Sequence, residues 1–304
     1  MENSNSFLCP ASLEPGDLIY ITAPAKAIEA SYVLNAKDLF ERAGFRVEVS
    51  QHCLGQHNYF SGTEEERLKD LQYGIDQPEI KAIICARGGY GCVQITDSIR
   101  WAGMLRDPKW LVGFSDVTVF HQKLQRFGIQ SLHASMPLNY KENTAEAIDT
   151  LLAELTGKRN SIAFNSHSNN KCGQANGILL GGNLSIIYSL IGTDDQPDYT
   201  GSILFIEDLS EQLYHIDRIF HSMLKAGILD KINGLIVGGM TEMKDTALPF
   251  GCSLEELILQ HFTYRKIPIC FNFPAGHIDD NRALRLGSSV SLSVFQDNAQ
   301  LDYL

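Results

Sequence analysis

The sequence lacks several features that would assign it to a class at once. Its 304 residues carry 25 basic and 36 acidic side chains, for a formal net charge of -11. Nucleic acids and anionic membranes attract basic surfaces, so we expect no nucleic-acid partner and no membrane partner. No apolar run approaches the roughly 18 residues that a membrane-spanning helix needs. The first residues show no basic segment followed by an apolar one, so no signal peptide is expected.

Cysteine is scarce and irregularly placed. No two of the seven cysteines form a C-x-x-C motif, and their spacing matches no zinc-ligand pattern. An odd number of thiols without a disulfide framework fits a reducing compartment, which predicts a cytoplasmic location. Cys85 and Cys270 lie within apolar runs and are expected to be small core residues.

What the first half does contain is a regular alternation of expected strands and helices. Short apolar runs are typical of buried parallel strands, and apolar residues at helical spacing fill the segments between them. Thr63 and Glu66 have the form of a capping box at the start of one helix. This pattern predicts a parallel sheet covered by helices on both faces. The expected strands are 17–23, 45–49, 80–86 and 110–112, and the expected helices include 32–43, 93–101 and 117–126.

The alternation loosens in a polar segment rich in Asn, Ser and Gly. We therefore expect a linker at 158–175, between an N-terminal α/β domain at 1–157 and a C-terminal domain at 176–304. Within the C-terminal domain, Gly227 is expected to end a helix at 213–225. The last stretch, 284–304, alternates like short antiparallel strands.

The stretch LVGFSDVT, residues 111–118, puts a serine where an expected strand turns into a helix. In a nucleophile elbow this turn keeps the serine hydroxyl clear of its neighbours. The usual G-x-S-x-G motif lacks its second glycine here, and Ser115 or Asp116 as a helix N-cap is the plainer alternative. If Ser115 is a nucleophile, the Asp116 N–H would contribute to an oxyanion hole.

A second loop, RGGYG at residues 87–91, follows the preceding expected strand. Its glycines would let the backbone approach a ligand closely. The loop lacks the Gly-Lys-Ser/Thr of a P-loop and the G-x-G-x-x-G of a dinucleotide fold, so phosphate binding is poorly supported. It is either a tight turn without function or the source of a second oxyanion donor, since parallel strands bring such loops to one sheet edge.

A serine nucleophile needs a base, and the base needs an orienting acid. Among nine histidines, His277 differs because it follows a Pro-Ala-Gly turn after an expected strand, and catalytic groups concentrate in such loops. Glu207 ends the strand SILFI in a similar way, while Asp208 and Glu211 compete for the acid's role. A packing histidine and a solvated or helix-capping acid are the alternatives. The order Ser115, Glu207, His277 is known among hydrolases.

Several stretches together resemble the LD-carboxypeptidase family, which comprises cytoplasmic murein tetrapeptide carboxypeptidases and relatives that give self-immunity to microcin C. The resemblance implies a Rossmann-like parallel-sheet N-terminal domain, a smaller β-rich α/β C-terminal domain and a homodimer. The stretches that carry it are, in order, GDLIYITAPA, SGTEEERLKDLQ, ICARGGYG, the GFSD turn, GILLGGNLSIIYSLIGT, ILFIEDLSEQLYHIDRIFHSMLKAGIL and FPAGH.

The same resemblance implies a serine peptidase whose Ser-Glu-His triad falls on Ser115, Glu207 and His277. It implies an oxyanion hole formed by the N–H groups of Gly89 and Asp116. The reaction it implies is removal of the terminal D-alanine from a murein tetrapeptide in cell-wall recycling, with no metal and no organic cofactor.

A carboxypeptidase must also recognise a free carboxylate, and arginine is well suited to that task. Arg87 and Arg282 are our candidates; surface charges or structural ion pairs are the alternative. Asn183 either lines the substrate site or caps a helix.

Two rival functions stay open. A related serine hydrolase that cleaves peptidyl-adenylates would need an aromatic platform for the adenine, and neither Tyr264 nor Trp101 is obviously placed for one. A catalytically inactive relative would bind muropeptides without cutting them, and the retained Ser, Glu and His count against it. A fluorophosphonate probe would label Ser115 in either enzyme and spare the inactive relative.

Overall fold

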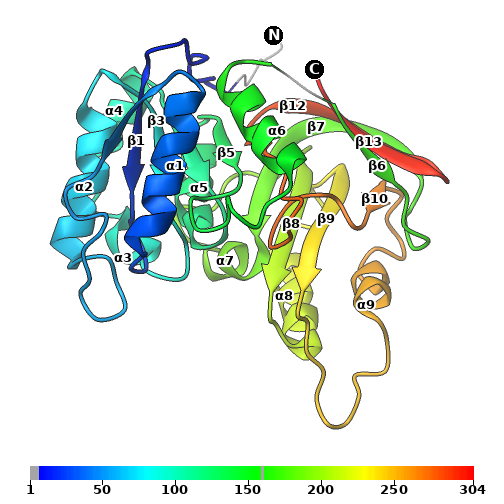
Figure 1. Ribbon diagram of the computed structural model, residues 1–304. Helices are drawn as coiled ribbons and strands as arrows, with labels where there is room; N and C mark the ends of the chain where they lie inside the picture. Colours follow the sequence, from blue (N-terminus) through cyan, green and yellow to red (C-terminus); the bar gives the residue numbers. More distant parts are fainter. Residues whose placement is uncertain (1–6, 159–160) are drawn as a thin grey trace. The chain divides into compact units, whose positions relative to one another are not determined.

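The structure is a computed structural model that describes residues 7–158 and 161–304 (Figure 1). The chain divides into two compact units, one of Met1–Arg159 with Asp279–Gly287, the other of Asn160–Ile278 with Ser288–Leu304. The domain boundaries expected from the sequence stay a prediction. Residues 1–6 of the expected N-terminal domain and residues 159–160 of the expected linker lie outside the described residues.

The first unit is built on a six-stranded sheet. Its strands are β1 (Leu18–Thr22), β2 (Arg46–Val49), β3 (Ile80–Cys85), β4 (Trp110–Gly113), β5 (Ser131–His133) and β11 (Leu284–Leu286). Their order is β11-β5-β4-β3-β1-β2, and β11 is antiparallel to β5 while the other pairs are parallel. This sheet confirms the α/β architecture expected for the N-terminal half.

Helices cover both faces of this sheet. On one face α1 (Ala30–Arg42) and α6 (Ala145–Leu155) bury Phe40 and Leu151 in a core with Ile21. Successive side chains of a strand point to opposite faces, so Tyr20 points to the other face. There Gly74 of α2 (Glu64–Asp76) lies so close that a Cβ would come within 2.8 Å of the Tyr20 ring. The other helices of this unit include α3 (Cys92–Thr96), α4 (Ala102–Arg106) and α5 (Thr118–Arg126).

One prediction about the helix ends of this unit is confirmed, and another is wrong. The capping box is confirmed, because the Glu66 N–H donates to Thr63 Oγ1 at 3.2 Å and the Thr63 N–H donates to Glu66 Oε2 at 2.8 Å. The single helix predicted over 93–101 is wrong, because α3 ends at Thr96 and α4 begins at Ala102. The Thr96 carbonyl accepts a 3.3 Å hydrogen bond from Trp101 Nε1, so the indole takes a carbonyl that a continued helix would use.

The second unit contains a seven-stranded mixed sheet. The sheet comprises β6 (Ile162–Asn165), β7 (Gly173–Asn183), β8 (Ile203–Leu209), β9 (Gly234–Thr241), β10 (Ile269–Cys270), β12 (Ser289–Val294) and β13 (Asn298–Tyr303). Its order is β10-β9-β8-β7-β12-β13-β6; the pairs from β10 to β7 are parallel, and the pairs from β7 to β6 are antiparallel. A β-rich α/β unit with antiparallel strands near the C-terminus is confirmed.

Three helices of the second unit follow its parallel strands: α7 (Leu184–Ser189), α8 (Leu213–Lys225) and α9 (Leu254–Gln260). Gly227, with a φ of 71°, lies just past α8 as expected for a glycine that ends a helix. All seven cysteines are free thiols, and Cys85 and Cys270 are fully buried as predicted. Within residues 7–158 and 161–304, no helix combines the length and apolarity needed to cross a membrane.

Candidate active site

The turn at Ser115 has the conformation of a nucleophile elbow. β4 ends at Gly113, and one turn of 3₁₀-helix, η1 (Ser115–Val117), leads into α5. The φ of Ser115 is 61°, in the left-handed region that residues with a Cβ rarely adopt. Such strained residues cluster at functional sites. Neither η1 nor α5 has a side-chain cap, so the alternative of Ser115 or Asp116 as helix N-cap is wrong.

The glycine loop after β3 lies directly against this elbow. β3 and β4 are adjacent and parallel, so the loops that follow them meet at one sheet edge. A Cβ on Gly88 would come within 3.0 Å of Ser115 Cβ and within 3.2 Å of both Ser115 Oγ and the Asp116 nitrogen. A Cβ on Gly89 would instead meet the side chain of Lys26. Donation by the Gly89 and Asp116 N–H groups stays a prediction.

Asp116, the residue that follows Ser115, is held in place by its own side chain. It is buried, and Oδ2 accepts a 2.9 Å hydrogen bond from the N–H of Cys92, the first residue of α3. Burial raises the pKa of the Asp116 carboxyl, while the hydrogen bond from Cys92 opposes that change. The carboxyl group therefore ties the start of α3 to the elbow.

In the second unit, Glu207 and His277 are joined by a hydrogen bond. Glu207 lies on β8 and is fully buried, and its Oε2 is 2.6 Å from His277 Nδ1. With the proton on Nδ1, the lone pair of Nε2 is the one that can accept a proton. Burial lowers the pKa of His277, but the charge and hydrogen bond of Glu207, with a smaller contribution from Asp208, together raise it above its ordinary value. This is the arrangement of a general base held by a carboxylate.

The backbone around this pair is closely packed. Gly276 has a φ of 111°, and a Cβ there would lie 2.7 Å from Glu207 Cβ. Thr241, the last residue of β9, donates a 3.2 Å hydrogen bond from Oγ1 to the His277 carbonyl. These contacts position the segment that carries the imidazole over the carboxylate.

The competing acid Glu211 has a different partner. Its Oε2 lies 2.5 Å from Nδ1 of His215, in the first turn of α8, and its Oε1 accepts a 3.3 Å hydrogen bond from Ser185 Oγ. The hydrogen bonds therefore favour Glu207 over Glu211 as the partner of His277.

Asn183 serves as a helix cap. Its side chain accepts a 3.2 Å hydrogen bond from the Ile186 N–H at the start of α7, and its Nδ2 donates to Asp208 Oδ1 at 3.0 Å. Asp208 also accepts from the N–H and hydroxyl of Ser185 at 2.9 and 2.8 Å. The capping role was the alternative for Asn183, and a substrate contact stays a prediction.

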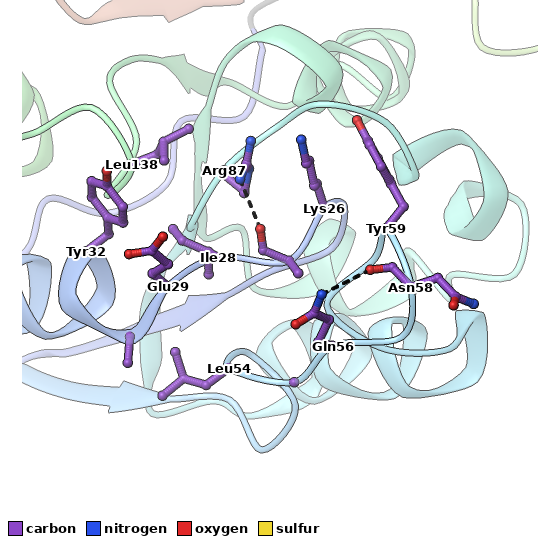
Figure 2. Close-up of a pocket in the computed structure, with 13 residues that line it drawn as sticks. Lys26, Ile28, Glu29, Tyr32, Leu54, Gln56, Asn58, Tyr59, Arg87 and Leu138 are labelled. Carbon is purple, nitrogen blue, oxygen red and sulfur yellow. Dashed lines mark hydrogen bonds between the residues drawn. The ribbon is translucent and has the colours of Figure 1, made fainter.

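A pocket of about 760 Å³ lies in the first unit next to the glycine loop (Figure 2). Lys26 and Arg87 both line it, as does Ala30, the first residue of α1, a helix without a side-chain cap. Arg87 Nη1 donates a 3.0 Å hydrogen bond to the Ala27 carbonyl, and its buried Nε has no hydrogen-bond partner among the described residues. Two cations and an uncapped helix N-terminus favour an anionic group in this pocket, although the carboxylate of Glu29 also lines it.

Arg282, the second arginine candidate, forms an ion pair. Its Nη2 is 2.9 Å from Asp280 Oδ2, and its Nε donates to Asp280 Oδ1 at 3.0 Å. This is the structural ion pair that was the alternative for Arg282, so the carboxylate contact stays a prediction and Arg87 is the stronger candidate.

The expected site residues therefore lie in two groups, one in each unit. Ser115 and the glycine loop belong to the first unit, and the Glu207–His277 pair belongs to the second; the complete triad stays a prediction. Sequence reasoning missed Gly88, although the glycine doublet was visible, and also the glycine before His277. Lys26 offered no signal, because a lone lysine in a loop is usually solvated.

The chain is similar in sequence and in fold to known LD-carboxypeptidases. Residues 19–134 match the LD-carboxypeptidase N-terminal domain, and residues 176–292 match the LD-carboxypeptidase C-terminal domain. A Synechocystis sp. protein named provisionally as a carboxypeptidase is 31% identical, covering 94% of this chain and 95% of its own. The murein tetrapeptide carboxypeptidase of Pseudomonas aeruginosa is 27% identical over 90% and 92% of the two chains. The crystal structure of muramoyltetrapeptide carboxypeptidase from Oxalobacter formigenes matches with a TM-score of 0.87 and 27% identity, covering 94% and 98%.

Proposed function

Because the chain belongs to the LD-carboxypeptidase family, we propose that it is a serine peptidase that removes the terminal D-alanine from murein tetrapeptides by hydrolysing an L,D bond. The observation that carries the proposal is the left-handed φ of 61° at Ser115, at the end of a strand and with no helix-capping role. The similarity to a murein tetrapeptide carboxypeptidase supports the choice of substrate.

In this proposal the side chains act in the order of a serine hydrolase. Ser115 Oγ attacks the carbonyl carbon of the scissile bond while His277 Nε2 takes its proton. His277 then gives that proton to the leaving amine of D-alanine, and water hydrolyses the acyl-enzyme with the imidazole again as base. The buried Glu207 holds the imidazole tautomer and stabilises the imidazolium that forms.

Backbone N–H groups would stabilise the oxyanion. The candidates are Asp116, at the start of the helix that follows the elbow, and Gly89 in the adjoining loop. One such donor contributes about 3 kcal/mol of transition-state stabilisation. The close approach of Gly88 to Ser115 supports this arrangement, because it brings the two loops into contact.

The pocket of Figure 2 is our candidate for substrate recognition. A murein tetrapeptide carries several free carboxylates, and Arg87 with Lys26 would bind one of them through charge-assisted hydrogen bonds. The buried, unpartnered Nε of Arg87 supports this role, since such a group gains most from an incoming acceptor.

We further propose that the enzyme acts in cytoplasmic cell-wall recycling as a homodimer. Seven free cysteines, four of them buried, support a reducing compartment. The dimer rests on the family resemblance, and sedimentation of the purified protein would test it.

The proposal is tested with L-Ala-D-Glu-meso-diaminopimelate-D-Ala and detection of released D-alanine by mass spectrometry. Wild-type protein is compared with Ser115→Ala and with Ser98→Ala, a control at an exposed serine of the same unit. We expect release by the wild type and the control, and none by Ser115→Ala. A fluorophosphonate probe should label the same two proteins.

Each other outcome removes a defined part of the proposal. Release by Ser115→Ala would exclude Ser115 as nucleophile and leave the reaction standing. Probe labelling without D-alanine release would exclude this substrate and favour a serine hydrolase of another class, such as one that cleaves peptidyl-adenylates. Neither release nor labelling would favour a relative that binds muropeptides without cutting them.

A further inference from the structure

Three side chains with metal-ligating atoms converge on α8 and the end of α9, and none of them belongs to the candidate active site. Asp217 and His221 lie one turn apart on α8, and His261 directly follows α9. The two helices, α8 and α9, are in contact within the second unit, and both are labelled in Figure 1. One ligand atom from each of the three side chains lies within 4.8 Å of the other two.

The distances from Asp217 to the two imidazoles are close to the spacing of ligands around a metal ion. His261 Nε2 is 3.0 Å from Asp217 Oδ1, and His221 Nε2 is 3.6 Å from Asp217 Oδ2. Zinc binds imidazole nitrogen and carboxylate oxygen at about 2.0–2.2 Å, so two such ligands of a tetrahedral ion are about 3.3 Å apart. The two distances run to different oxygens of Asp217 and lie on either side of that value, so small side-chain shifts would bring one atom of each residue to a common ion.

We propose that Asp217, His221 and His261 form a binding site for one divalent transition-metal ion of the zinc type. Two imidazoles and a carboxylate are the ligand set such ions prefer, whereas magnesium and calcium prefer oxygen ligands alone. Three protein ligands at a partly exposed position leave the fourth coordination position to water. The proposal does not depend on the peptidase function.

The environment of His261 suits a metal ligand. Its ring is buried and stacks on Phe220, with 5.3 Å between ring centroids and 22° between planes, so its orientation is fixed. Its Nε2 lies 3.0 Å from Asp217 Oδ1, so the ring already faces the carboxylate that would share the ion. The positive charge of the nearby Arg265 guanidinium would repel a bound cation, but Arg265 is ion-paired with Asp230.

His221 completes the set from the solvent side. Its distance of 3.6 Å to Asp217 exceeds a hydrogen bond, and its ring meets the ring of His261 edge-on at 4.7 Å between centroids. Because His221 is exposed, its side chain can turn to close the remaining distance to an ion. A bound ion would join α8 to the segment after α9, so metal binding should also raise the melting temperature of the protein.

The test uses the full chain without a histidine tag, stripped with a chelator and titrated with Co²⁺, whose four-coordinate complexes absorb strongly in the visible range. We expect one Co²⁺ per chain, displacement by Zn²⁺ and a higher melting temperature with either ion. His221→Asn, an exposed change, should weaken binding at least about tenfold and abolish the absorption band. His57→Asn, at an exposed histidine of the other unit, should change neither.

Asp217→Asn and His261→Asn should weaken binding as His221→Asn does. If His261→Asn fails to fold, the exposed His221 and half-buried Asp217 variants still decide the matter. Absence of a visible band in the wild type would overturn the proposal. So would binding that His221→Asn and Asp217→Asn leave unchanged; the three residues would then be a hydrogen-bonded contact between two helices.

Discussion

The Nδ1 atom of His277 lies 2.6 Å from an oxygen of Glu207 that is fully buried on β8. Water does not screen this carboxylate, so its charge acts strongly on the imidazole. The closest rival acid, Glu211, is engaged with His215 instead. The orientation of the candidate base is therefore set by one specific carboxylate.

Peptidase activity should be lost as the pH falls through a value above 6.5. As the proposed base, His277 must be deprotonated to act. Glu207 raises the pKa of His277, so the acidic limb of kcat/KM should lie at higher pH than for an ordinary histidine. Glu207→Gln removes the charge but keeps the burial that lowers the pKa, so the limb should move to lower pH. The activity that remains should be about 10⁴-fold lower. Profiles of kcat/KM on the tetrapeptide measure both effects, and identical midpoints in the two proteins would contradict the role of Glu207.

Gly276→Ala should destabilise the second unit by more than the cost of placing an alanine at a positive φ. The new Cβ would sit 2.7 Å from Glu207 Cβ and also require a positive φ. Gly251→Ala is the matched control, because Gly251 has a φ of 95° and no atom within 4 Å of a new Cβ. We expect a loss of about 3 kcal/mol in unfolding free energy for Gly276→Ala and about 1 kcal/mol for Gly251→Ala. Urea denaturation measures both, and equal losses would show that the contact with Glu207 is unimportant.

Arg87→Met should raise KM for the tetrapeptide by about tenfold to a hundredfold, because a charge-assisted hydrogen bond to the substrate is lost. If Arg87 binds ground state and transition state alike, kcat should change little. Arg100→Met is the control, since Arg100 pairs with Asp76 on an exposed surface. Steady-state kinetics decide the point. A fall in kcat with KM unchanged would place Arg87 in the chemical step and not in substrate recognition.

Glu154→Leu should cost about 3–5 kcal/mol of stability, because it leaves the buried guanidinium of Arg285 without its carboxylate. Both side chains are only 3% exposed, and Arg285 Nε donates to Glu154 Oε2 at 2.8 Å. Adding Arg285→Met should recover most of the loss, since an apolar pair of similar size can replace a buried ion pair. Thermal or urea unfolding of the single and double variants measures this coupling, and additive losses would contradict it.

Elements with strong local signals could be predicted from the sequence. β3 is an apolar run interrupted only by Lys81, and the helix after Thr63 carries its own capping box, so both elements could be expected from the local sequence. The helix predicted over 93–101 failed because its interruption depends on the Trp101 indole bonding to the Thr96 carbonyl. A tertiary contact of that kind leaves no periodic trace.

The candidate site shows the same division. Ser115 and His277 could be nominated because each follows the end of an expected strand. The choice between Glu207 and Glu211 could not be made from spacing, since both lie close to the end of β8 and only the hydrogen bonds separate them. The metal-ligating set could not be predicted either, because Asp217 and His221 lie on α8 while His261 follows α9, far away in sequence.

Because Asp279–Gly287 returns to the first unit, the two units cannot be exchanged as independent domains. The chain passes between the units three times, after residues 159, 278 and 287, so no single cut separates them. During synthesis, β5 must wait for β11 before its outer edge is paired, and an unpaired edge strand invites aggregation. Recombination at the polar segment around 158–175 would join a foreign β11 to the native sheet. A chimera that exchanges one unit must therefore also keep the segment Asp279–Gly287 with the first unit.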